Sequence, residues 1–280
     1  MIQKDIQQHE AYKQIAIASY SSKKERVEKK LLPQGYKEIS SASMFDGLYY
    51  TVLRKDNEII VCFRGTELSD NGDLRNDIAM LFRRIPIQAK YALNIYDSIK
   101  ETYPDCKITV IGHSLGGSLA QIVGAMRDVK AVTFNAFGTL DILKKNRVQN
   151  INPTNITNYC NPDDNITCIN ASNHIGKCYE IETVPIEGKG PHNIECIDSL
   201  ENRLPVTGED LDFQYRMQEK VKREWEFYKR TGRRMPITMP SLGYHSDNCA
   251  GTYPVQGYTR DDGTKVSGYT RTCGAKHLNG

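Results

Sequence analysis

Two hydrophobic periodicities alternate along the first 200 residues of the chain. Short runs rich in Val, Ile, Phe and Tyr, typical of strands, are separated by segments whose apolar residues recur at helical spacing. The first two runs flank Lys55-Asp56-Asn57 and predict a β-hairpin. Strands are predicted at 48–54, 58–63, 107–111, 131–134, 154–159 and 178–184, and helices at 10–22, 88–104 and 118–126.

Strands that alternate with helices predict an α/β domain with a mostly parallel sheet and helices on both faces. Ligands of such folds bind beyond the carboxyl ends of the strands. Residues that carry chemistry are therefore expected immediately after strands.

The turn Gly112-His113-Ser114-Leu115-Gly116 follows one predicted strand and precedes a predicted helix. Glycines on both sides of the serine allow a strand to reverse sharply into a helix, which exposes the hydroxyl of Ser114 as a nucleophile. The first amide of the helix, at Leu115, is positioned to stabilise a developing oxyanion. His113 is expected to be a packing residue.

A carboxylate and an imidazole are needed to activate such a serine. Asp163 and Asp164 follow the strand predicted at 154–159, and the next predicted strand leads into a glycine-rich loop that contains His192. His174 precedes that strand and would emerge at the wrong edge of the sheet, so His192 is the favoured base. The order nucleophile, acid, histidine is the order that this type of fold requires.

Two further segments follow the strand predicted at 58–63. Thr66, beyond Gly65, offers an N–H and a hydroxyl to the same oxyanion that Leu115 serves. Residues 78–87 are rich in Ile, Leu, Met and Phe, and they predict either a short core helix ended by Pro86 or a mobile apolar cover over the site.

Three motifs together resemble the class 3 lipases, which are α/β-hydrolases related to fungal triacylglycerol lipases. They are Phe63-Arg64-Gly65-Thr66, Gly112-His113-Ser114-Leu115-Gly116-Gly117, and Asp164-Asn165-Ile166 followed by His192-Asn193-Ile194. The small-residue helix around Ala11 to Tyr20 is similar too, and together these features cover about residues 10 to 200.

The resemblance implies a role for each of these positions. Ser114 would be the nucleophile, His192 the general base, and Asp164 the acid, with Asp163 as the fallback. Thr66 and Leu115 would form the oxyanion hole, 78–87 would be a lid, and no cofactor would take part in catalysis. Asp73 and Asp77, an acidic pair of the family, are expected to be structural. The chain lacks the aromatic-histidine-glycine cluster that usually precedes the crossover helix, and Asn135-Ala136-Phe137 replaces a proline-containing turn, which leaves the substrate shape open.

Composition changes this picture little. A net charge of +3 over 280 residues does not predict nucleic-acid binding. No stretch resembles a secretory signal or is long enough to span a bilayer, so a cytoplasmic location is the default expectation, with non-classical export as the alternative. Most of the eight cysteines are accordingly expected to be reduced thiols.

The hydrolase-like pattern fades near residue 204, which predicts three parts: a hydrolase domain at 1–204, a basic amphipathic helix within 205–243 and a small tail at 244–280. The basic stretch 211–234 either packs on its own domain or lies on an anionic membrane. Two Gly-Tyr-Thr-Arg repeats in the tail predict a hairpin. Its flanks carry a candidate structural zinc site, for which a Cys249–Cys273 disulfide is the alternative: His245, Cys249, Cys273 and His277.

The function predicted from sequence is a serine esterase or lipase that hydrolyses carboxylic esters of phospholipids or acylglycerols through an acyl-enzyme. Two alternatives stay open. One is a hydrolase-fold binding protein without catalysis, and the other is an exported bacterial effector with phospholipase activity.

Overall fold

The structure is a computed structural model of the 280-residue chain. It describes residues 3–44, 47–65, 74–164, 167, 173–206, 230, 252–255, 258–259, 265–266 and 269–272, and for 74–84, 86 and the strands beyond residue 250 it describes the backbone only. The chain divides into two compact units, Met1–Glu226 and Phe227–Gly280. The finer three-part division stays a prediction.

Within the described part of the first unit, eight strands form one sheet in their order along the chain. The five central strands, β3 to β7, run parallel, whereas β1, β2 and β8 pair antiparallel at the two edges. The sheet is therefore mostly parallel, as the alternating pattern predicts. The strands are β1 (Lys37–Ser43), β2 (Tyr49–Lys55), β3 (Glu58–Arg64), β4 (Lys107–His113), β5 (Lys130–Phe134), β6 (Ile156–Cys160), β7 (Lys177–Glu180) and β8 (Leu204–Val206).

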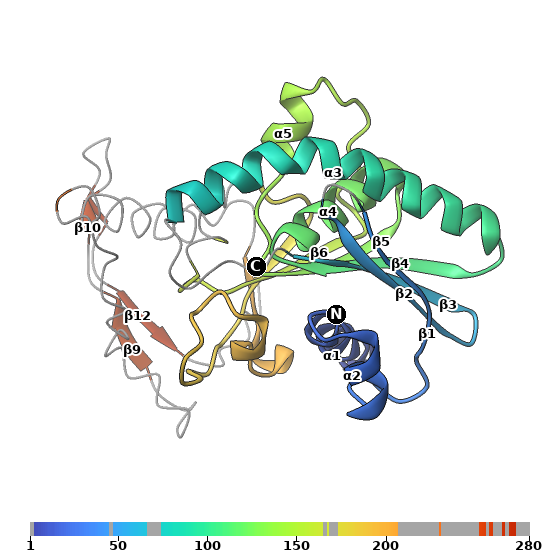
Figure 1. The fold of residues 1–280 in the computed structure, drawn as a ribbon. Coiled ribbons are helices and arrows are strands. Elements are labelled where there is room, and N and C mark those ends of the chain that lie inside the picture. Colours follow the sequence, from blue (N-terminus) through green and yellow to red (C-terminus); the bar gives the residue numbers. More distant parts are fainter. Residues whose placement is uncertain are drawn as a thin grey trace. The chain divides into compact units, whose positions relative to one another are not determined.

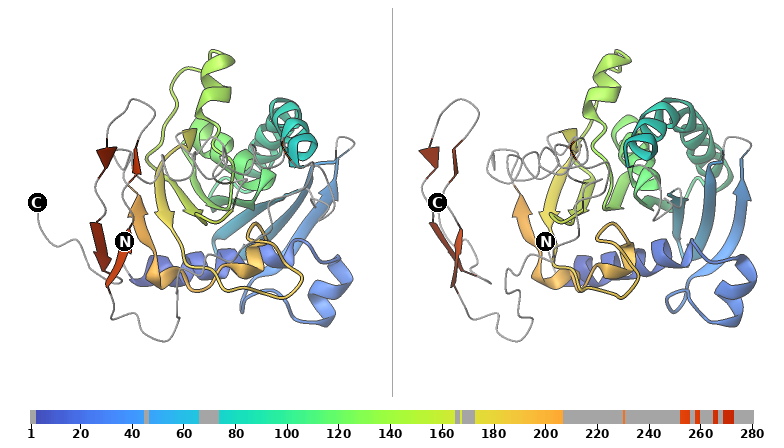
Figure 2. Two further views of the ribbon diagram at one scale, coloured as in Figure 1. Left: turned by 90° about the vertical axis from the view of Figure 1, so that its left-hand side faces the viewer. Right: turned by 60° about the vertical axis from the view of Figure 1, so that its left-hand side comes forward.

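Helices cover both faces of this sheet (Figure 1). The N-terminal helices α1 and α2 lie on one face, and α3, α4 and α5 lie on the other, an arrangement that Figure 2 shows from two further sides. The short 3-10 helices η2 and η3 pack beside α1. The helices are α1 (Gln3–Ala18), α2 (Lys23–Glu28), α3 (Leu74–Thr102), α4 (Leu115–Arg127), α5 (Leu140–Lys145), η2 (Ile194–Cys196) and η3 (Leu200–Asn202).

Strand β3 shows why both faces need cover. Val61 and Phe63 join the core on the α3 and α4 side, whereas Ile60 and Cys62 join the core on the α1 side. Successive side chains of a strand point to opposite faces, so a run that is apolar at every position is stable only when both faces are buried. All four side chains are fully buried, which fixes β3 in the centre of the sheet.

The prediction of a short helix ended by Pro86 is wrong, because the helix continues through this residue. A single helix, α3, runs from Leu74 to Thr102 and includes both residues 78–87 and the crossover segment that was predicted as a separate helix. A proline inside a helix costs about 3 kcal/mol, because it removes one hydrogen bond and clashes with the preceding turn. Burial of Ile85, Ala89 and Ala92 in the core on either side of this position offsets the cost.

The edges of the sheet differ from the predicted strands. The last strand, predicted at 178–184, ends at Glu180 in β7. The chain then passes through the loop that carries His192 and returns as β8, which pairs with β7 and extends two residues past the predicted domain boundary at 204. The sequence also gave no signal for β1, whose side chains are mostly exposed or half-buried.

The second unit contains two short antiparallel pairs among its described residues. Strand β10 (Tyr258–Thr259) pairs with β11 (Lys265–Val266), and β9 (Thr252–Val255) pairs with β12 (Tyr269–Thr272). Antiparallel pairing agrees with the predicted hairpin, but the two Gly-Tyr-Thr-Arg repeats do not pair with each other. The first repeat contributes β10, which pairs with β11, and the second contributes β12, which pairs with β9. Among the described residues of the whole chain, every helix is too short or too polar to traverse a lipid bilayer.

Candidate active site

Ser114 stands at the turn between β4 and α4. Its backbone has φ 58° and ψ −127°, a conformation that non-glycine residues rarely adopt, and it forms the N-cap of α4. The turn is compact because two positions have no room for a side chain. A Cβ at Gly112 would overlap the backbone of Gly116, and a Cβ at Gly116 would overlap the carbonyl oxygen of Phe63 on β3. The geometry is that of the nucleophile turn predicted from the spacing of the glycines.

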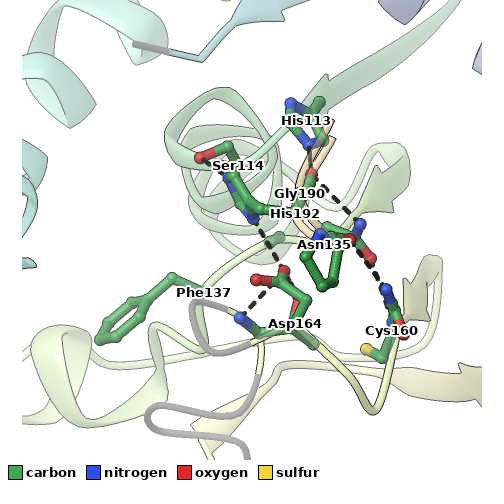
Figure 3. A network of polar contacts seen from close by, with 12 residues as sticks. His113, Ser114, Asn135, Phe137, Cys160, Asp164, Gly190 and His192 are labelled. Carbon is green, nitrogen blue, oxygen red and sulfur yellow. Dashed lines mark hydrogen bonds and ion pairs between the residues drawn. The ribbon is translucent and has the colours of Figure 1, made fainter. Parts of the chain in front are cut away.

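The structure brings together three side chains that are far apart in the sequence (Figure 3). The Nε2 atom of His192 lies 2.7 Å from the Oγ of Ser114, and its Nδ1 lies 2.8 Å from Oδ2 of Asp164. The imidazole therefore lies between hydroxyl and carboxylate, in contact with both. A ring in this position is able to accept the serine proton on one nitrogen while the other donates to the carboxylate.

Asp164, and not Asp163, is the carboxylate in contact with His192. The side chain of Asp164 is 1% exposed, and its Oδ2 also accepts hydrogen bonds from the backbone N–H and the hydroxyl of Thr167, at 3.2 and 2.6 Å. Donors around a carboxylate stabilise its charged form, which offsets the cost of burying it. Asp163 is half-buried, and its N–H donates to Asn161 within the turn.

Two asparagines hold the backbone of the His192 loop. Asn161 donates from Nδ2 to the carbonyl oxygen of Pro191 at 2.8 Å, and Asn135 donates to that of His192 at 3.4 Å. The side chain of Asn135 also accepts from the N–H of Asn161, so the loops after β5, β6 and β7 are tied to one another. Both asparagines are fully buried. The sequence did not identify them, because an asparagine in a loop does not indicate its partner.

His113 does more than pack, which corrects the expectation for this residue. It is buried, its Nδ1 lies 2.7 Å from the hydroxyl of Tyr20, and its Nε2 lies 2.8 Å from the carbonyl oxygen of His192. A carbonyl oxygen only accepts, so Nε2 carries the proton and Nδ1 accepts from Tyr20. Burial, followed by the charge of a protonated His192, lowers the pKa of His113 to about 3. His113 therefore stays neutral and in one tautomer near neutral pH.

The groups predicted for the oxyanion hole are described in part. Leu115 is the first residue of α4, where backbone N–H groups have no partner within the helix. Thr66 lies outside the described residues. Its neighbour Gly65 lies close to the nucleophile. A Cβ added to Gly65 would lie 3.0 Å from the Cβ of Ser114 and 2.7 Å from the carbonyl oxygen of His113.

The remaining predicted residues lie elsewhere or are not described. His174 is not part of the Ser114 site and lies beside Cys160 and Cys178. Asp73 lies outside the described residues, and for Asp77 and most of 78–87 only the backbone, in α3, is described. The basic stretch 211–234, apart from Arg230, also lies outside the described residues. So do the four residues of the predicted tail zinc site: His245, Cys249, Cys273 and His277.

Comparison with protein families gives a match over more than half of the chain. Residues 10–182 match the phospholipase-like family described as the Tle-like phospholipase domain. The chain belongs to this family. The lipase resemblance seen in the sequence motifs is thereby confirmed, and so is the α/β-hydrolase fold. Membership places the chain among lipase-type carboxylic ester hydrolases.

Curated relatives match over short stretches. The "Putative lipase ATG15" of Candida glabrata is 50% identical over 48 residues, which is 17% of this chain and 10% of that protein. The protein of the same name from Pichia angusta is 39% identical over 66 residues, which is 24% of this chain and 12% of that protein. The matched segments thus span about a tenth of the length of these relatives.

Solved structures of fungal lipases match over a longer part of the chain. The lipase from Rhizopus microsporus var. chinensis has a TM-score of 0.48 at 18% identity, over 67% of this chain and 78% of that one. The Lip2 lipase from Yarrowia lipolytica has a TM-score of 0.49 at 15% identity, over 76% of this chain and 91% of that one.

Proposed function

We propose that the chain is a serine hydrolase that cleaves carboxylic esters of lipids, with Ser114 as the nucleophile, His192 as the general base and Asp164 as its carboxylate partner. The observation that carries this proposal is the 2.7 Å contact between the Ser114 hydroxyl and Nε2 of His192. A base within hydrogen-bond distance of a hydroxyl is the arrangement that activates serine in known acyl-transfer enzymes.

In the proposed reaction, Oγ of Ser114 attacks the ester carbonyl while Nε2 of His192 takes its proton. Asp164 accepts the hydrogen bond from Nδ1 and stabilises the imidazolium. The oxyanion binds the N–H of Leu115, together with Thr66. When the tetrahedral intermediate collapses, the alcohol leaves with the proton from His192 and an acyl-enzyme remains. Water, deprotonated by His192, then attacks the acyl carbon and releases the fatty acid and the free Ser114.

We place phospholipids ahead of acylglycerols as substrates. The family description names phospholipases, and the basic stretch 211–234, which the sequence predicts as an amphipathic helix, suits an anionic lipid surface. The Ser114 side chain is fully buried, so an ester reaches it only after a neighbouring segment moves. We retain residues 78–87, in the N-terminal half of α3, as that segment.

The test of this function compares the wild-type chain with Ser114→Ala on a short-chain p-nitrophenyl ester and on phosphatidylglycerol vesicles. We expect Ser114→Ala to lose at least about a thousandfold in kcat on both substrates, because the bond-forming atom is removed. The matched control is Ser98→Ala, which removes an exposed hydroxyl on α3 and should keep wild-type rates.

Equal rates for the wild type and Ser114→Ala would refute the proposed nucleophile. A folded wild-type protein that binds the vesicles and releases no fatty acid would favour the alternative of a hydrolase-fold binding protein. Hydrolysis of triacylglycerol emulsions at a higher kcat/KM than phospholipid vesicles would reverse the proposed order of substrates and leave the ester hydrolase assignment intact.

A further inference from the structure

A second cluster of reactive side chains lies beside the loop that carries Asp164. It consists of Cys160 at the end of β6, His174 just before β7, and Cys178 on β7. One ligand atom from each residue lies within 4.8 Å of the other two, and the Sγ of Cys160 is 3.8 Å from Nε2 of His174. Neither cysteine forms a disulfide in the structure. This cluster has no part in the acyl-transfer reaction.

We propose that Cys160, His174 and Cys178 bind a structural Zn²⁺ ion. Zinc binds thiolate sulfur at about 2.3 Å and imidazole nitrogen at about 2.0 Å with tetrahedral geometry, which separates the bound sulfur and nitrogen atoms by roughly 3.5 Å. The 3.8 Å between Sγ of Cys160 and Nε2 of His174 is close to this value, and a ligand atom of Cys178 lies within 4.8 Å of the other two, so binding requires only small movements of three side chains. Two thiolates and one imidazole favour zinc over the harder cations calcium and magnesium.

A buried asparagine supports one of the ligands. Asn158 on β6 donates from Nδ2 toward the Sγ of Cys178 at 3.8 Å and to the carbonyl oxygen of Ile175 at 2.9 Å. Its own side-chain oxygen accepts a hydrogen bond from the hydroxyl of Thr133 at 2.7 Å. Groups that fix the orientation of a ligand and donate to a thiolate are typical of the surroundings of protein metal sites.

The remaining coordination position lies near the main chain. The carbonyl oxygen of Ala136 is 3.0 Å from Nε2 of His174, and either this oxygen or a water molecule completes four-fold coordination. In the structure this carbonyl oxygen accepts the Nε2–H of His174, because a carbonyl oxygen only accepts. Zinc binding through Nε2 replaces this hydrogen bond and moves the ring proton to Nδ1. Each of the two thiols loses a proton when it binds, so up to two protons are released per zinc ion and no electrons are exchanged.

The position of the cluster suggests what the ion does. Cys160 comes four residues before Asp164, and His174 comes ten residues after it. Figure 3 shows Cys160 next to the segment that carries Asp164. A zinc ion bound by Cys160 and His174 would join the two ends of this segment to β7 through Cys178. The site thus fixes the base of the loop that presents the proposed catalytic carboxylate, a role that rests on the proposed function, whereas metal binding itself does not.

The test is elemental analysis of the full-length chain purified without chelators. Cys249→Ser/Cys273→Ser removes the thiols of the predicted tail site, and in this background we expect about one zinc ion per chain. Adding Cys160→Ser/Cys178→Ser should reduce the zinc content at least tenfold. The matched control adds Cys106→Ser, a half-buried cysteine outside the cluster, and should keep the metal.

Cobalt(II) provides a second measurement, which reports the ligands of the bound ion directly. Titrated into metal-free Cys249→Ser/Cys273→Ser protein, it should give the intense sulfur-to-cobalt charge-transfer absorption of a tetrahedral site with two thiolates. His174→Gln should weaken cobalt binding at least tenfold. A chain that contains no zinc and gives no such absorption would overturn the proposal. A Cys160–Cys178 disulfide in the freshly isolated protein would also overturn it. If the wild-type chain contains zinc but has no esterase activity, the proposed function is refuted and the zinc site is not.

Discussion

His113 shows how a residue adjacent to the nucleophile acts on the base through the main chain. Its Nε2 donates to the carbonyl oxygen of His192 and its Nδ1 accepts from Tyr20, so the imidazole connects the turn after α1 to the loop that carries the base. Because burial lowers its pKa to about 3, His113 is neutral near neutral pH. It is a positioning residue, because it contacts the main chain of His192, whereas the ring of His192 contacts the Ser114 hydroxyl.

Replacement of His113 by leucine is expected to lower kcat by roughly fivefold to tenfold with little change in KM, since one hydrogen bond that positions the base contributes about 1 kcal/mol. His113→Asn keeps a donor and should recover part of the lost kcat. Steady-state kinetics on a soluble ester measure the effect, with thermal unfolding as the check on folding. Identical kcat values for the leucine variant and the wild type would show that the contact does not position His192.

The three residues in contact at the site were predictable, and those that hold them in place were not. Ser114, Asp164 and His192 follow predicted strands, and parallel strands bring their carboxyl ends to one edge of the sheet. The choice between Asp163 and Asp164 depends on which carboxylate points at the imidazole. The role of Asn135 likewise depends on its contact with the His192 loop, more than 50 residues away in the chain. The sequence carries no local signal for such a contact.

At the scale of elements, the position of the nucleophile depends on the close approach of α4 to β3. Gly116 lies so near the main chain of Phe63 that no side chain fits between the helix and the strand. Elements whose backbones are in contact position the atoms attached to them more precisely than elements separated by flexible side chains. Gly116 therefore determines how closely α4 packs on the sheet, in addition to allowing the turn at Ser114.

Gly116→Ala is expected to lower the free energy of unfolding by about 2 to 3 kcal/mol, because the added methyl group meets immobile main-chain atoms. The matched control is Gly190→Ala, where a Cβ meets nothing within 4 Å and φ is not positive. Urea unfolding of both variants measures the difference. A Gly116→Ala variant as stable as Gly190→Ala would mean that helix and strand are further apart than described.

The elements that the sequence predicted well are those whose periodicity agrees with their burial. The hairpin of β2 and β3 has apolar runs on both sides of a polar turn, and both strands form where expected. Strand β1 was missed because its sequence, Lys-Glu-Ile-Ser-Ser-Ala-Ser, is that of a polar edge strand, held by main-chain pairing with β2. Helix α3 passes through Pro86 because burial of its apolar face outweighs the local preference to end the helix.

At the scale of the whole molecule, buried ionisable groups link stability to pH. His9 on α1 is buried against the sheet, with Nδ1 2.8 Å from the hydroxyl of Tyr159. Burial, and next the charge of Lys130, lower the pKa of His9 to about 3, while Asp5 acts in the opposite direction. The folded state therefore holds His9 neutral, whereas the unfolded state binds a proton below about pH 6.5.

The stability that depends on neutral His9 is complete above about pH 6.5 and is lost as the pH falls toward 3, by up to ~1.4 kcal/mol per pH unit. His9→Gln is expected to reduce this slope between pH 6.5 and 5, where most carboxylates remain ionised. Urea unfolding at several pH values measures it. Part of the pH dependence of the unfolding free energy should remain in this variant, since the lowered pKa of His113 has the same effect. An unchanged slope would show that His9 is protonated in the folded state.

The central claim is that Ser114 is activated by His192, and covalent labelling tests it most directly. A fluorophosphonate forms a bond between its phosphorus and the serine oxygen, with loss of fluoride and transfer of the serine proton to the base. Peptide mass spectrometry should locate a single phosphonate on Ser114, and His192→Ala should slow the labelling at least a hundredfold. Label on another residue, or an equal rate of labelling without His192, would contradict the account.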